Sequence, residues 1–507
     1  MKLQLIGHNE KYALEQSLLA LFPGERPVYG EIEPADTRWA IVALREESGR
    51  VEVVTELHYD GKSARQSRSC PLSGGEYQRE GQRRHALGLS FFAAAKEALD
   101  IAPPWGSLTG VRPTKVALAL LRQGGREYAR KMLGETYCVT PERRLLAIEA
   151  AEAGIRAAAG LLPHDISLYA GIPFCPTRCA YCSFVAQSVE KTFSMVEPYL
   201  DALRREIEAA GAVVRDLGLH VKSFYMGGGT PTTLTARQLD RLLTALEDSF
   251  DFSGLAELTI EAGRPDTIDE EKLSTLRAHG VTRLSVNPQS MNDDVLAAIG
   301  RRHTAADIRH AMALVRDAGF PHVNMDLIAG LPEDTPESFS ASLEACLGLG
   351  ADNITVHTLS LKKGSRITLA QNTPDGRIPG AQDVEKMLDY ANASLRKHGY
   401  APYYLYRQKY MSGSFENVGW ALPGAESLYN ICIMEELHGI LSLGAGGSTK
   451  MVGRDASCSP VIRRAFNAKY PREYIERPEK WRANLDLFTA FYQMQPAYTP
   501  KESSERL

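Results

Sequence analysis

The run Pro173-Phe174-Cys175-Pro176-Thr177-Arg178-Cys179-Ala180-Tyr181-Cys182 holds three of the eight cysteines of this 507-residue chain. Their spacing is C-x3-C-x2-C, and the run follows an apolar stretch, Ile166 to Ile172, that is typical of a β-strand. A tight loop at the end of a strand can turn three thiols towards one point. Because eight cysteines are too few for a disulfide scaffold of this length, the clustering indicates a metal site.

Three thiolates from one loop suit a [4Fe-4S] cubane in which one iron keeps an open position. An open iron can chelate the amino and carboxylate groups of S-adenosylmethionine. Structural zinc is the alternative, but it prefers four closed ligands, and no fourth cysteine or histidine lies near Cys182. We therefore expect Cys175, Cys179 and Cys182 to bind the cluster. The remaining cysteines have no comparable spacing and are interpreted as ordinary thiols: Cys70, Cys138, Cys346, Cys432 and Cys458.

From Ile166 onward, short β-rich runs alternate with longer amphipathic segments. One of these segments places Val196, Leu200, Leu203 and Ile207 at the spacing of one helix face. This alternation predicts an α/β fold, an incomplete (β/α)6 barrel, with its chemistry at the carboxyl ends of parallel strands. The six predicted strands are Ile166 to Ile172, Val221 to Met226, Ala256 to Glu261, Val281 to Val286, His322 to Ile328 and Asn353 to Leu359.

Further candidate residues lie at the predicted strand ends. The glycine-rich loop Gly227 to Thr232 follows the second strand, where missing side chains let a ligand approach the backbone. Glu261, Gln289 and Asp326 follow at the third, fourth and fifth strands, and together they suit the hydroxyl and amino groups of a nucleoside ligand. Arg301 suits either a ligand carboxylate or a surface role.

The chain should form three domains. Residues 1–162 are expected to be an α+β domain of unknown role, residues 163–399 the barrel, and residues 400–507 a small C-terminal domain with a polar tail. Within the first domain, a helix should begin at Thr140 as the capping residue, with Pro141 at its first position, and run towards Ala159. The predicted strands and helix before it are Val28 to Glu33, Arg38 to Leu44, Val51 to His58 and Glu76 to Leu99.

Charge and hydropathy exclude several classes of protein. Lys and Arg number 58 and Asp and Glu 62, so the formal net charge of -4 lacks the basic footprint of a nucleic-acid binder. His8, Asn9 and Glu10 stand where a signal peptide would be apolar, and no apolar run of membrane-spanning length follows. We expect a cytoplasmic protein with no membrane span.

These motifs resemble the oxygen-independent coproporphyrinogen III oxidase family of radical-SAM proteins. The resemblance covers roughly residues 166–452. Its motifs are Tyr169 to Phe184, the Gly227 to Thr232 loop, Glu261, Gln289 to Ser290, and Asp326 to Pro332. Three further segments resemble the HemZ-type coproporphyrinogen dehydrogenase branch: Trp105 to Lys115 (WGSLTGVRPTK), Asn287 to Gln289, and Tyr404 to Trp420.

The resemblance implies roles for individual residues. Cys175, Cys179 and Cys182 would ligate the [4Fe-4S] cluster. The residues implied to bind S-adenosylmethionine are Tyr169, Tyr181, Gly228, Gly229, Thr230, Glu261, Gln289, Arg301 and Asp326. The implied reaction converts propionates of coproporphyrinogen III to vinyl groups through a 5'-deoxyadenosyl radical, giving protoporphyrinogen IX. It requires an electron donor that the sequence does not identify.

One position departs from the oxidases of that family, which carry a further cysteine where this chain has Phe184. Phe184 resembles the branches that include haem-binding chaperones. A haem carrier on the same fold, with His357 as the histidine to examine, therefore stays open, as does a radical-SAM enzyme with another substrate. Basic residues suited to a carboxylate-rich substrate, or to a solvated charge run, are Arg301, Arg302, Lys362, Lys363 and Arg366.

Overall fold

The chain divides into two compact units in this computed structural model, which describes residues 1–22, 25–101, 103–182, 187–360, 378–407, 415–455 and 460–495. Unit 1 comprises Met1–Ile148 together with Arg407–Phe415, and unit 2 comprises Glu149–Tyr406 together with Glu416–Leu507. The predicted domain boundaries at residues 162 and 399 stay predictions.

Unit 2 is built around six parallel strands that follow one another in the sheet in chain order. They are β6 (Asp165–Ile172), β9 (His220–Gly228), β10 (Glu257–Glu261), β11 (Arg283–Ser285), β12 (His322–Ala329) and β13 (Asn353–Thr358). Each pairs in parallel with the next. All six predicted strands and the incomplete (β/α)6 barrel are confirmed.

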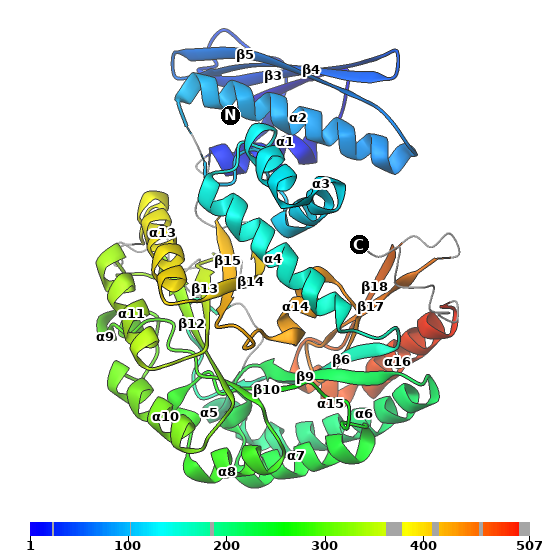
Figure 1. Ribbon diagram of the computed structural model, residues 1–507, viewed down its shortest axis with the longest axis vertical. Helices are drawn as coiled ribbons and strands as arrows, with labels where there is room; N and C mark the ends of the chain where they lie inside the picture. The colour runs from blue at the N-terminus through cyan, green and yellow to red at the C-terminus, as the bar shows by residue number, and fades with distance from the viewer. Residues whose placement is uncertain are drawn as a thin grey trace. The chain divides into compact units, whose positions relative to one another are not determined.

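Helices follow the convex side of this curved sheet (Figure 1). They are α5 (Val189–Thr192), α6 (Val196–Asp216), α7 (Ala236–Ser249), α8 (Glu270–Ala278), α9 (Asp293–Ala298), α10 (Ala305–Asp317), α11 (Pro336–Gly348) and α13 (Ala381–Lys397), with single 3-10 turns η1 (Phe193–Met195), η2 (Pro231–Thr233) and η3 (Pro265–Thr267). The predicted face of α6 is buried, including Val196, Leu200, Leu203 and Ile207. Burial of these apolar faces against the strands is the main source of stability in such a layer.

Alternate strand residues divide the sheet into an apolar face and a polar face. Leu168, Phe224, Ile260 and Leu327 belong to the apolar core. The other face carries polar side chains that bond to one another across neighbouring strands, as Ser167 does with Ser223 at 2.6 Å between hydroxyl oxygens. Because these polar groups are largely buried, their mutual hydrogen bonds offset the cost of removing them from water.

The sheet continues beyond the six strands on both sides and has eleven strands within the part of the chain that the structure describes. Next to β13 lie β15 (Glu416–Ala421) and then β14 (Ala401–Arg407), and next to β6 lie β16 (Gly439–Leu443), β17 (Ser448–Arg454) and β18 (Pro460–Phe466). The strands of the predicted C-terminal region thus extend the sheet of the barrel. Helices α14 (Leu428–Glu435), α15 (Pro471–Glu476) and α16 (Pro478–Gln493) belong to the same region, and a short ribbon pairs β7 (Phe174–Cys175) with β8 (Gln187–Ser188).

Unit 1 contains a five-stranded sheet in the order β2-β1-β3-β4-β5. Its strands are β1 (Lys2–Ile6), β2 (Val28–Tyr29), β3 (Arg38–Glu47), β4 (Arg50–Tyr59) and β5 (Lys62–Pro71), and its helices are α1 (Lys11–Leu21), α2 (Glu76–Leu99) and α3 (Pro113–Glu135). The predicted α+β composition is confirmed, although the strand expected over Val28 to Glu33 is only two residues long.

The segment Trp105 to Lys115 binds the start of the second stretch of unit 1. The backbone N-H of Arg407 donates to the Val111 carbonyl at 2.7 Å, and its guanidinium donates to the Leu108 carbonyl and lies 5.6 Å from the Trp105 ring centre. This motif therefore holds residues that are about 300 positions away in the chain.

Helix α4 (Pro141–Ala159) has the predicted bounds, but its predicted cap is wrong. The Thr140 hydroxyl is buried and has no hydrogen-bond partner among the described residues. The Thr140 carbonyl accepts from the Arg144 N-H at 2.9 Å, so the first helical hydrogen bond forms without a contribution from the Thr140 side chain. No described helix is both long enough and apolar enough to cross a membrane.

A turn after β16 fits tightly against the end of β6. Gly444 has a φ of +86°, and a Cβ added there would lie 2.7 Å from the Gly171 carbonyl oxygen and 2.6 Å from the Tyr199 hydroxyl. Tyr199 donates to that same carbonyl at 2.5 Å and accepts from the Ala445 N-H at 2.9 Å. The strand that leads into the cysteine loop is thus fixed from α6 and from the C-terminal region.

We predict that Gly444→Ala lowers the free energy of unfolding by about 2–4 kcal/mol, since left-handed strain and steric overlap act together. Gly446→Ala is the matched control: its φ is +74°, but an added Cβ would have only ordinary contacts. Its cost should be about 1–2 kcal/mol. Chemical denaturation of both variants measures the difference. Equal destabilisation would show that the close approach to Gly171 contributes nothing to the free energy of unfolding.

Candidate metal and cofactor site

The cysteine loop is bonded to the glycine loop that ends the neighbouring strand. The Gly229 N-H donates to the Ile172 carbonyl at 2.8 Å, and the Thr230 N-H donates to the Phe174 carbonyl at 2.7 Å. The Thr230 hydroxyl also lies 3.4 Å from the Cys175 sulfur. The two loops that the sequence singled out separately therefore form one structure.

Glycine is required in this loop for packing as well as for ligand access. A Cβ at Gly229 would lie 2.5 Å from the Phe174 carbonyl oxygen, and Gly228 has a φ of +103°. The Gly228 N-H bonds the Glu261 carboxylate, so the N-H groups of Gly228, Gly229 and Thr230 all have acceptors within the protein. A ligand beside this loop would consequently find these three N-H groups already bonded.

Two buried arginines surround Cys179, which is itself 9% exposed. Arg264 Nη1 lies 3.5 Å from the Cys179 sulfur, and side-chain hydrogen bonds from Arg301 and Tyr181 reach the same thiol. Burial opposes ionisation of Cys179, but the charges of Arg301 and Arg264 outweigh it and lower the pKa of the thiol. A thiolate is the form that binds metal, so the two arginines favour the ligating state of Cys179.

Arg264 was not among the residues predicted from the sequence. The only signal for it was its position, three residues after Glu261 and therefore beyond a strand end, where the loops of a barrel carry function. A single arginine in such a loop is usually on the surface, so only the structure shows that this side chain is 3% exposed.

The three thiols share one electrostatic environment. Burial raises the pKa of Cys175 to about 12, and the charges of Cys182 and Cys179 add to that rise. All three are free of disulfides. A cubane spreads its thiolates over several irons, so three cysteines from one loop can each bind a different iron. The donor set fits a cluster.

A carboxylate and three tyrosines lie on the polar face of the sheet. Tyr225 donates to Glu261 Oε1 at 2.6 Å, and its ring lies 4.7 Å from that of Tyr429 and 6.3 Å from that of Tyr169, in stacked geometry. Burial raises the pKa of Glu261 to about 7, and the charge of Asp326 adds to that rise. Tyr429 comes from α14, so the C-terminal region contributes to this face.

Asp326 stays ionised more readily than Glu261. Burial opposes ionisation of Asp326. A hydrogen bond from His357 and the charge of that histidine lower the pKa of Asp326, as do hydrogen bonds from Asn324 and Thr355. Asn324 Nδ2 donates to Asp326 Oδ1 at 2.8 Å, and His357 Nε2 lies 3.7 Å from Asp326 Oδ2. The structure therefore places Glu261, Asp326 and His357 in one group, in which the pKa of Glu261 is raised and that of Asp326 is lowered.

Gln289 and Arg301 are fixed by backbone contacts. Gln289 has a φ of +69°, accepts from the Ile328 N-H at 3.0 Å and donates its own N-H to the Asp326 carbonyl at 2.9 Å. Arg301 Nη1 donates to the Asn287 carbonyl at 2.5 Å, and Nη2 donates to the Tyr181 hydroxyl at 3.1 Å. Its buried Nε has no hydrogen-bond partner among the described residues, which leaves a donor for a ligand.

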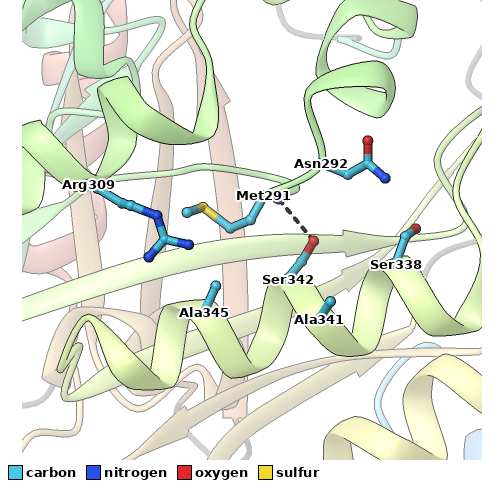
Figure 2. A pocket seen from close by; sticks show the side chains of 7 residues that line it. All are labelled: Met291, Asn292, Arg309, Ser338, Ala341, Ser342 and Ala345. Atoms are coloured by element: carbon cyan, nitrogen blue, oxygen red, sulfur yellow. Dashed lines mark hydrogen bonds between the residues drawn. The ribbon is translucent and has the colours of Figure 1, made fainter.

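A separate pocket of about 310 Å³ lies away from these residues (Figure 2). Its lining comes from α11, from the chain entering α9, and from α10, which contributes Arg309. The Met291 N-H donates to the Ser342 hydroxyl at 2.9 Å inside it. None of the predicted site residues lines this pocket, so we do not assign the chemistry to it.

The structure thus groups the predicted residues into two sets. Cys175, Cys179, Tyr181, Thr230 and Arg301 surround the cysteine loop, while Tyr169, Glu261 and Asp326 lie on the polar face, with the glycine loop touching both. Phe184 and the basic residues Lys362, Lys363 and Arg366 lie outside the described residues.

Comparison with known proteins points to one family. Residues 169–346 match the Radical SAM superfamily. The chain is 36% identical to the "Oxygen-independent coproporphyrinogen-III oxidase-like protein HemZ" of Bacillus subtilis (strain 168), over 95% of this chain and 96% of that protein. It is 32% identical to the "Heme chaperone HemW" of Lactococcus lactis, over 59% of this chain and 74% of that protein.

A solved structure is also similar. It is described as "Coproporphyrinogen III oxidase (HemN) from Escherichia coli is a Radical SAM enzyme", and it matches with a TM-score of 0.51 and 26% identity. The match covers 65% of this chain and 72% of that one.

The raised pKa of Glu261 predicts a pH-dependent contribution to stability. Because the pKa is about 7 in the fold against an ordinary 4.5, the carboxyl gains a proton on folding within this range. The resulting stabilisation is complete below pH 4.5 and is lost as the pH rises through about 7.

The difference in unfolding free energy between the parent and Glu261→Gln should therefore fall across that range, by on the order of 1 kcal/mol or more, and level off above about pH 8. Denaturation titrations at several pH values measure it. Glu271→Gln, on the exposed surface of α8, is the control for loss of a carboxylate outside the site. A flat difference for Glu261→Gln would refute the raised pKa.

Proposed function

Because the chain belongs to the radical SAM superfamily and to its oxygen-independent coproporphyrinogen-III oxidase-like family, we propose that it oxidatively decarboxylates propionate side chains of coproporphyrinogen III. Each propionate would become a vinyl group, and two rounds would give protoporphyrinogen IX. The observation that carries the proposal is the 36% identity over 95% of the chain to an oxidase-like relative. The cofactors of this family are a [4Fe-4S] cluster and S-adenosylmethionine.

Cys175, Cys179 and Cys182 are the proposed cluster ligands. The pKa of Cys179, lowered by Arg301 and Arg264, and the bonds between the cysteine and glycine loops support this assignment. Two guanidinium groups near one thiol also provide positive charge for an anionic cluster.

The polar face offers complementary groups for S-adenosylmethionine. We propose that the carboxylates of Glu261 and Asp326, with the Gln289 side chain, receive amino and hydroxyl groups of the ligand. The glycine loop of Gly228, Gly229 and Thr230 would contact it through carbonyl oxygens. Arg301 Nε, buried and without a partner among the described residues, suits the ligand carboxylate. Tyr169 and Tyr181 would border the site.

Cys175, Cys179 and Cys182 would hold the cluster, which, once reduced, would supply together with S-adenosylmethionine the radical chemistry needed to remove a hydrogen atom from the substrate propionate. The residues of this chain hold the reacting groups in place and exclude water. The substrate loses one hydrogen atom, carbon dioxide and one further electron in each round. The reaction therefore needs a one-electron donor for the cofactors and an electron acceptor for the substrate, and both are partners that we leave unidentified.

A haem carrier is the second candidate, because the chain also resembles the Lactococcus chaperone. The histidine singled out for that role, His357, has a 27% exposed side chain and lies 3.7 Å from Asp326. Its place beside Glu261 and Asp326 favours a role in the polar site over haem ligation.

A cytoplasmic location completes the proposal. The described cysteines are all free of disulfides, as is usual in a reducing compartment.

We predict that serine at Cys175, Cys179 or Cys182 reduces bound iron and sulfide at least tenfold after anaerobic reconstitution, since a hydroxyl is a poor cluster ligand. Cys70→Ser is the control, because Cys70 lies on β5 of unit 1. Iron and sulfide analysis with absorption spectroscopy measures the outcome. Full cluster content in all three variants would reject the ligand assignment.

The substrate is tested by incubating the reconstituted protein anaerobically with dithionite, S-adenosylmethionine and coproporphyrinogen III. We expect 5'-deoxyadenosine and protoporphyrinogen IX together, and neither from Cys179→Ala. Chromatography quantifies both products. Deoxyadenosine without porphyrin conversion would retain the radical chemistry and discard this substrate, whereas tight haem binding with neither product would favour the carrier.

A further inference from the structure

Arg264 lies between the end of β10 and the cysteine loop. Its Nη2 donates to the Thr177 hydroxyl at 2.9 Å, and its Nη1 lies 3.5 Å from both the Thr177 carbonyl oxygen and the Cys179 sulfur. On the other side, Nε donates to Asp266 Oδ1 at 3.3 Å. One guanidinium thus binds two residues of the cysteine loop, Thr177 and Cys179, and its contact with Cys179 is to the proposed ligand sulfur.

The charge around Arg264 is only partly balanced. Its carboxylate partner Asp266 is 35% exposed, whereas the Arg264 side chain is 3% exposed. His303 lies 3.9 Å from the same carboxylate, but burial and the charges of Arg301 and Arg264 lower its pKa to about 3, so it is neutral. Among the described residues, Asp266 is the carboxylate paired with Arg264, and its exposure to water leaves part of the positive charge of Arg264 beside the sulfur, together with that of Arg301.

We propose that Arg264 is a positioning residue that raises the reduction potential of the cluster by donating a charged hydrogen bond to the Cys179 sulfur. A one-electron reduction adds a negative charge to the cluster and its thiolates, and the fixed positive charge stabilises the reduced form more than the oxidised form. This inference rests on the proposed ligand role of Cys179, and it is independent of the tetrapyrrole substrate.

The neighbouring carboxylate, Asp266, provides a second variant, which should shift the reduction potential in the opposite direction. Asp266 draws part of the guanidinium charge away from the sulfur, so its removal leaves more of that charge for the cluster. Because Asp266 is 35% exposed, Asp266→Asn carries little risk to the fold. Loss of the arginine and loss of the carboxylate should therefore shift the potential in opposite directions.

The test is a redox titration of the reconstituted full-length protein, without substrate, in which the reduced cluster is quantified by electron paramagnetic resonance. At the midpoint potential of the parent, Arg264→Met should lower the ratio of reduced to oxidised cluster about tenfold, equivalent to ~59 mV for one electron. Arg264→Lys should lower it less, because it keeps the charge but not the forked geometry. Asp266→Asn should raise the ratio.

Arg241→Met is the matched control, since Arg241 pairs with Glu197 on an exposed surface of the same unit and should leave the ratio unchanged. A full cluster in Arg264→Met with the potential of the parent would overturn the inference. If Arg264→Met binds no cluster, Asp266→Asn decides: a raised ratio supports the inference and an unchanged ratio overturns it. If the parent protein converts no coproporphyrinogen III while the Arg264 and Asp266 variants still show the expected shifts in reduction potential, the result counts against the proposed function alone.

Discussion

Two backbone hydrogen bonds hold the candidate site together: those from the glycine loop to the carbonyls of Ile172 and Phe174. They fix the cysteine loop to the strand that precedes it and to the strand that follows. Side chains at Gly229 would separate these segments, because the space for a Cβ is already filled by a carbonyl oxygen. The approach of the Thr230 hydroxyl to the Cys175 sulfur depends on that closeness.

Burial on the polar face of the barrel opposes ionisation of both Glu261 and Asp326, and it is outweighed only at Asp326. Glu261 is driven towards its protonated form, while Asp326 stays ionised because His357 and Asn324 stabilise its charge. Such a pair can accept from one group and donate to another at the same pH, which suits a ligand that carries both amino and hydroxyl groups. Stacked tyrosines from β6, β9 and α14 lie beside Glu261, and Tyr225 donates to its carboxylate.

The six barrel strands could be predicted because each is a short β-rich run bounded by amphipathic helices, and because parallel strands bring their ends to one mouth. The sequence did not reveal what lies beside Cys179: Arg264 and Arg301 reach it from loops 85 and more than 100 residues away, and no local pattern encodes such contacts. Thr140 shows the opposite failure, since a residue type that favours capping was present but its hydroxyl makes no bond among the described residues. The strand beginning at Val28 was overestimated, because alternation alone does not guarantee a neighbour to pair with.

Unit 1 is not a simple appendage at the start of the chain. Its second stretch, Arg407–Phe415, is inserted between β14 and β15, and Arg407 is bound by the segment that begins at Trp105. The chain consequently passes between the two units three times, and no single proteolytic cut can release unit 1 whole.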